Sequence, residues 1–176
     1  MSTQKSVLLK PQDLVVALKI CANEQQDFVL QTLSTELGLA ISVVHGCITR
    51  CEASKLLSRS SGSLRANRNA VREFTIHGAR YAFPAMLGSL TRGMPTAVAG
   101  PILSPMFEHG AALPPVWPTA NGTAYGPGVQ PLHPCVPTAC ETDAPLYALL
   151  TLLDALRVGA AREQAIAMRE LEDRLS

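Results

Sequence analysis

Apolar residues recur at helical spacing along the first third of the chain and predict three short helices. The first begins at Pro11, which the first turn of a helix tolerates, and ends near residues 23–26. Asp27 is a suitable N-cap for the second helix, and Gly38 can end it in the left-handed conformation. The third follows after two residues and carries one apolar stripe, made of Val44, Cys47, Ile48 and Cys51. Two helices joined by a short turn that contains glycine indicate a helix-turn-helix.

A short basic segment follows the third helix. Arg59, Arg65 and Arg68 surround Gly62, a pattern that predicts a β-hairpin whose arginines meet DNA phosphates. From residue 55 to residue 80 there are six basic residues and one acid. A fourth helix is expected over 67–81. Positive charge clustered beside a helix-turn-helix indicates DNA binding, whereas the alternative is a solvated loop on an ordinary three-helix bundle.

The run from Leu33 to Leu57 resembles the helix-turn-helix of bacterial winged-helix regulators of the MarR type. In that family a Leu-Gly-Leu turn precedes a helix that ends in Glu-x-x-Gly-Leu-Leu, and this chain has Leu37-Gly-Leu39 and Glu52-Ala-Ser-Lys-Leu-Leu57. Ala40 stands where a Ser or Asn cap is usual, so Ser42 is an alternative cap, and Ser54-Lys55 replaces the usual glycine. The resemblance covers residues 10 to about 80 and implies a DNA-binding transcriptional regulator.

In such a regulator, the face of the third helix opposite its apolar stripe contacts DNA. This face presents short or polar side chains that can approach base edges in the major groove, and Arg50 can reach guanine or phosphate. Together with the hairpin arginines, the predicted DNA-contacting residues are Ile41, Ser42, His45, Thr49, Arg50, Arg59, Arg65 and Arg68.

The middle of the chain has a different composition. Residues 84–140 contain 11 of the 13 prolines and seven of the 12 glycines, but only two charged side chains, Arg92 and Glu108. Apolar, proline-rich sequence is expected to lie as an ordered, irregular strap against the helices or across a subunit partner, and the strap can include a short strand. A floppy tether is the alternative, against which the lone Trp117 argues, since a large apolar ring in water is unfavourable.

The last region returns to helical periodicity. Its apolar stripe consists of Leu146, Leu149, Leu150, Leu153 and Leu156. We expect this stripe to form the seam of a homodimer, because helix-turn-helix proteins commonly read two half-sites as two-fold dimers. The alternative is that the stripe belongs to the core of a single chain.

The charges are distributed unevenly along the chain. The 176 residues carry a net charge of +1, but residues 1–82 hold ten basic and six acidic side chains, and residues 83–176 hold five and eight. A basic front and an acidic back indicate a partner. The sequence has no run of about 18 consecutive apolar residues that would predict a membrane span, and its first residues do not resemble a secretory signal. A cytoplasmic protein without membrane contact is therefore expected.

Evidence for chemistry is sparse. The sequence lacks the glycine-rich nucleotide loops, the Gly-x-Ser-x-Gly elbow and the His-Glu-x-x-His motif, so no enzyme and no cofactor are expected. The five cysteines are irregularly spaced, and no metal site is assigned. One cluster is worth testing as a zinc site: His133, Cys135 and Cys140, with His109 as a fourth ligand.

These inferences combine into one prediction. The fold is expected to be mainly α, with an N-terminal winged helix-turn-helix over 1–82, a proline- and glycine-rich strap over 83–140, and C-terminal dimerisation or partner-binding helices over 141–176. The expected function is a transcriptional regulator that binds double-stranded operator DNA as a homodimer. The alternatives are an antitoxin-like module whose acidic half grips a protein partner, and a metal or small-molecule sensor.

Overall fold

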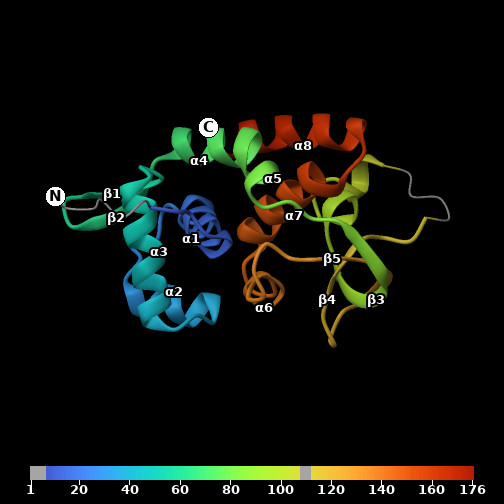
Figure 1. The fold of residues 1–176 in the computed structure, drawn as a ribbon, viewed down its shortest axis with the longest axis horizontal. Helices are drawn as coiled ribbons and strands as arrows, with labels where there is room; N and C mark the ends of the chain where they lie inside the picture. The colour runs from blue at the N-terminus through green and yellow to red at the C-terminus, as the bar shows by residue number, and fades with distance from the viewer. Residues whose placement is uncertain (1–6, 108–111) are drawn as a thin grey trace.

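In the computed structural model, which describes residues 7–107 and 112–176, helices and strands occur at both ends of an elongated molecule (Figure 1). Helices α1 to α3 and a hairpin form one end, and a small sheet forms the other. Helix α7 lies between them, and α8 runs along one side. All of these elements contribute to one hydrophobic core.

The first end, called the head here, contains α1 (Pro11–Ala22), α2 (Leu30–Leu37), α3 (Ile41–Ala53) and the hairpin of β1 (Leu57–Ser60) and β2 (Ser63–Ala66). The three helices and the hairpin expected from the sequence are confirmed. Helices α2 and α3 meet at an angle of 110°, at a turn where Gly38 has a φ of 62°. Helix α2 begins at Leu30, and its N-cap is the extended Val29 rather than Asp27; the Phe28 side chain between them is buried.

A second helical run joins the head to the rest of the chain. It comprises α4 (Arg68–Glu73), a π-helical turn (Phe74–Gly78) and α5 (Ala79–Ala82), so the fourth helix is confirmed but is not regular. Asn67 caps it by accepting a hydrogen bond from the Ala70 N–H. A Cβ at Gly78 would lie 2.8 Å from Cδ2 of Phe74, which explains the glycine at this position.

The proline-rich region is a sheet rather than a strap. Strand β3 (Leu87–Pro95) pairs antiparallel with β4 (Val116–Pro118) and with β5 (Ala124–Val129), and β4 meets β5 in parallel, which closes a small barrel. Two 3-10 turns (Ala97–Ala99 and Ser104–Met106) lie between β3 and β4. Glycine is required where chain segments cross closely: a Cβ at Gly126 would lie 1.8 Å from the Pro114 carbonyl oxygen.

The C-terminal region contains α6 (Val136–Cys140), α7 (Ala144–Val158) and α8 (Ala161–Arg174). Helix α7 packs against α1, α8 and the segments that adjoin the sheet, so it is apolar on nearly every side. All five leucines of the predicted seam are buried within the single chain. The assignment of this stripe to a dimer seam is therefore wrong, and the alternative of an internal core is confirmed.

The expected fold class is also wrong. Of the described residues, 53% are helical and 16% lie in strands, in a mixed three-stranded sheet and a two-stranded antiparallel sheet, so the fold is mixed α and β. An N-terminal winged helix-turn-helix is not clearly set apart as a domain. The physical reason is that α1, buried from Asp13 to Cys21, packs on both α3 and α7 and is shared by the two ends of the molecule.

Two buried carboxylates, Asp143 at the N-cap of α7 and Asp154 within the helix, connect the ends. The Asp143 carboxylate accepts hydrogen bonds from Lys19 of α1 and from the Leu146 N–H. The Lys19 ammonium also lies 2.5 Å from Glu36 of α2. Burial alone would lower the pKa of Lys19, but its hydrogen bonds to Asp143 and Glu36 raise it overall. This cluster fixes the head on the N-terminus of α7.

The second carboxylate, Asp154, holds the sheet. It accepts hydrogen bonds from Trp117 Nε1 at 2.5 Å, from Thr96 Oγ1 at 2.8 Å and from Arg157 at 2.6 Å. The Trp117 ring is buried, as expected of an ordered segment.

Among the described residues, no single helix is long and apolar enough to cross a membrane; α2 and α3 pass the length and composition test only as a bent pair.

Candidate nucleic-acid interface

The outer face of α3 is exposed because its inner face is buried. Val44, Cys47, Ile48 and Cys51 pack into the core, as the sequence predicted. The opposite face leaves Ile41, Ser42, His45 and Thr49 in solvent. Val43 is also exposed, although it is not among the predicted DNA-contacting residues. Neither Ala40 nor Ser42 caps the helix with its side chain, so the start of α3 lacks a side-chain cap.

Arg50 faces α1 rather than the solvent-exposed side of α3. Its guanidinium donates two hydrogen bonds of 2.7 Å to the Asp13 carboxylate, which is fully buried and also accepts the Lys10 N–H at 2.8 Å. The hydrogen bonds to Asp13 raise the pKa of Arg50 above its ordinary value. The predicted contact between Arg50 and guanine or phosphate does not fit this geometry, because the guanidinium already joins α3 to α1.

The hairpin stands next to α3 with its arginines outward. The register pairs Arg59 with Leu64 and Ser58 with Arg65, so Arg59 lies on the hairpin face of the buried Leu57 and Leu64, and Arg65 lies on the opposite face. Both arginines are exposed. Ser61 and Gly62 both have positive φ, which suits the tight turn that the sequence predicted around Gly62.

The two hairpin arginines have acidic neighbours. Arg59 lies 2.9 Å from Glu52 at the end of α3, and Arg65 lies 2.8 Å from Asp27. All four side chains are at least one third exposed, so each ion pair is weak and can exchange its partner for a phosphate. Both guanidinium groups are therefore accessible from the solvent.

Arg68 does not lie with the other two. Its guanidinium pairs with Glu24 at 2.5 Å and donates hydrogen bonds to the carbonyl oxygens of Arg174 and Ser176. It therefore ties the end of the chain to α1 and α4. The prediction that Arg68 contacts phosphate as part of the hairpin is corrected, because this side chain is already bound to the C-terminus.

Lys55 takes the backbone conformation that explains the glycine of the MarR pattern. It has a φ of 65°, in the left-handed region, and it is exposed between α3 and β1. We expect Lys55→Gly to raise the free energy of unfolding by about 0.5–1 kcal/mol, because relief of left-handed strain exceeds the added chain entropy of glycine. Urea unfolding measures this gain. Lys55→Ala, which removes the charge but keeps the Cβ, is expected to give no gain, and an equal gain would contradict the explanation.

The cysteines and histidines form no metal site among the described residues, in which no group of three or more His, Cys, Asp or Glu side chains could hold an ion. His133 Nδ1 accepts the Cys135 N–H at 3.2 Å. His109, the fourth ligand considered, lies outside the described residues, as does Glu108. Burial raises the pKa of the Cys135 thiol to about 11 and that of Cys47 to about 12, so both remain protonated at neutral pH.

Comparisons with known proteins give no relative. No protein-family model, no curated protein and no solved structure matches this chain. Function is therefore inferred from the geometry of the head and from the resemblance of residues 33–57 to the MarR-type helix-turn-helix.

Proposed function

We propose that this chain binds double-stranded DNA through the outer face of α3 and the β1–β2 hairpin, and that it regulates transcription. The observation that carries the proposal is the exposed α3 face of Ser42, His45 and Thr49, in the same head as the exposed Arg59 and Arg65. A major groove about 12 Å wide admits a single helix whose outer side chains are this short. The hairpin arginines would then lie at the flanking phosphates.

The net positive charge of the front 82 residues favours a weak attraction to DNA. The front 82 residues carry four more basic than acidic side chains. Because Arg50 and Arg68 are bound within the chain, Arg59 and Arg65 are the cations of the predicted set that remain for phosphates. A head with two such contacts is expected to bind DNA modestly and with a measurable dependence on salt.

Replacing Arg59 and Arg65 together with alanine is expected to weaken binding equally on all sequences. The plot of log K against log salt concentration should lose a slope of about 1.8, since each phosphate contact contributes about 0.9. Fluorescence anisotropy with a labelled random duplex measures both quantities. Arg169→Ala, an exposed arginine on α8 away from the head, is the matched control and should leave the slope unchanged.

An unchanged slope in the double variant would remove the hairpin from the proposal. Absence of any binding by the wild type at low salt would remove DNA binding altogether. Sequence-specific contacts are tested by His45→Ala and Thr49→Ala, which should reduce the preference for DNA from upstream of the chain's own gene more than the affinity for random DNA.

A further inference from the structure

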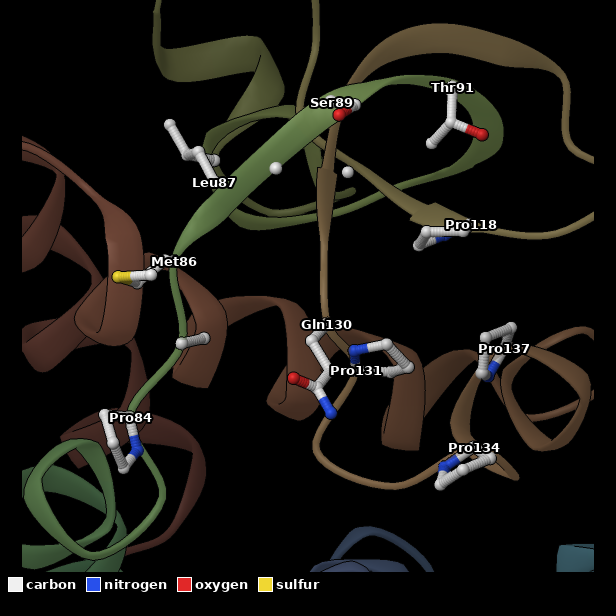
Figure 2. Close-up of a pocket in the computed structure, with 13 residues that line it drawn as sticks. Pro84, Met86, Leu87, Ser89, Thr91, Pro118, Gln130, Pro131, Pro134 and Pro137 are labelled. Carbon is white, nitrogen blue, oxygen red and sulfur yellow. The ribbon is translucent and has the colours of Figure 1, made fainter.

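An apolar groove lies between the sheet and α6 (Figure 2). Its volume is about 1000 Å³. Figure 2 shows Met86 and Leu87 on one side of the groove, and Pro134 and Pro137 on the opposite side. No charged side chain lines it. The prolines around it come from five places in the sequence: Pro84, Pro118, Pro131, Pro134 and Pro137.

Strand β3 borders this groove with a free edge. Its C-terminal part, Gly93–Pro95, pairs with β4, but Leu87, Leu90 and Thr91 pair only with β5, and the register with β5 shifts between Leu87 and Leu90. Among the described residues no strand lies on its other side, and residues 86–90 are all exposed. An unpaired strand edge offers main-chain N–H and C=O groups to another extended segment.

Large apolar side chains stand at this same edge. Met86 is 83% exposed, Leu87 is 54% exposed and Leu90 is 53% exposed, whereas most leucines of the chain are buried in the core. An edge with exposed apolar side chains next to an apolar groove is the arrangement that binds a strand by β-addition, with main-chain hydrogen bonds for affinity and a groove for side chains.

The lack of charge limits what can occupy the groove. Across the described parts of residues 84–140, Arg92 is the single Lys, Arg, Asp or Glu side chain. Nucleic acids and strongly charged peptides find no counter-charge on such a surface, whereas two identical uncharged surfaces meet without repulsion. Depletion of charge is also what distinguishes the centre of a protein interface.

We infer that a second copy of this chain occupies the groove, with the free edge of β3 in each copy paired antiparallel to that of the other. The interface is isologous, because each copy supplies both the apolar side chain and the groove. With Ser89 on the two-fold axis, Leu87 of each chain comes to lie opposite Thr91 of the other, which lines the groove. The buried leucines of α7 take no part in this pairing.

The first test is the mass of the protein in solution, by light scattering and sedimentation at micromolar concentration. The wild type is expected to be a dimer. Leu87→Lys should weaken the dimer at least about tenfold, because the edge then buries two unpaired like charges. The control is Leu8→Lys, at a 76% exposed leucine of the head, which should leave the mass unchanged. Circular dichroism of both variants checks that they are folded.

The second test is proximity. Ser89→Cys is expected to form an interchain disulfide under mild oxidation, because directly opposite residues in an antiparallel pair have Cβ atoms about 4.5–5.5 Å apart. Ser58→Cys, on the hairpin, is the control and should not cross-link. A monomeric wild type overturns the inference, and so does a dimer that resists Leu87→Lys and is not linked through residue 89.

The proposed dimer and the proposed DNA binding can be refuted independently of each other. A dimer of the expected kind that binds no DNA leaves the inference intact and removes the proposed function. A monomeric wild type that binds DNA through Arg59 and Arg65 does the reverse.

Discussion

Replacing Arg50 with alanine is expected to lower the free energy of unfolding by about 3–5 kcal/mol. The change removes one partner of a buried ion pair and leaves the Asp13 carboxylate without a counter-charge in the core, where the Lys10 N–H and the Cys47 thiol still contact it. Urea unfolding followed by circular dichroism measures the loss. Because the head as a whole is loosened, binding to specific and to random DNA should weaken together.

The neighbouring Thr49 provides the matched control. Its side chain is exposed and bonds only to the His45 carbonyl of its own helix, so Thr49→Ala should change stability by no more than about 0.5 kcal/mol. Arg50→Lys cannot make both hydrogen bonds to Asp13 and should fall between alanine and the wild type. A stable Arg50→Ala variant that loses only its preference for specific DNA would restore the base-contacting role for Arg50.

Replacing Leu153 with aspartate is expected to unfold the chain rather than to separate subunits. Leu153 is completely buried in the middle of α7, so the substitution removes a core side chain and places a charge without a partner in its position. The two effects together cost at least about 4 kcal/mol, a large part of the stability of a typical domain. Circular dichroism and size-exclusion chromatography distinguish unfolding from a folded monomer.

Leu8→Asp is the control for the added charge, since Leu8 is exposed on the head and should tolerate it. Leu153→Ala, which removes the side chain without adding charge, should cost about 2–5 kcal/mol and leave the oligomeric state unchanged. A folded, monomeric Leu153→Asp variant would show that the α7 stripe is a seam after all.

Local patterns were sufficient to predict the head. The periodicity of Val44, Cys47, Ile48 and Cys51 identified the buried face of α3, and the turn residues near Gly62 located the hairpin. Both depend on spacing within one element, which the order of residues determines directly. The exposed face of α3 follows from the same periodicity, and so the positions of Ser42, His45 and Thr49 were predictable.

Partners distant in the sequence were not predictable in this way. Arg50 has the position of a DNA-contacting residue on the helix, but Asp13, 37 residues earlier, holds its side chain. Arg68 lies in the basic run, but the last residues of the chain accept its hydrogen bonds. A formal charge in the sequence indicates attraction to phosphate only if no buried or distant group has already paired with it.

The sequence by itself determined the local elements of this protein: the helices, the hairpin, and which apolar positions of each are buried. Tertiary structure alone decided how those elements combine. It made the proline-rich region a sheet, because glycines such as Gly126 let segments cross at a distance that no side chain allows. It also buried the α7 leucines on every side, since α1 and α8 both pack on that helix. Periodicity is a property of one segment, whereas burial and pairing depend on which other segments arrive beside it.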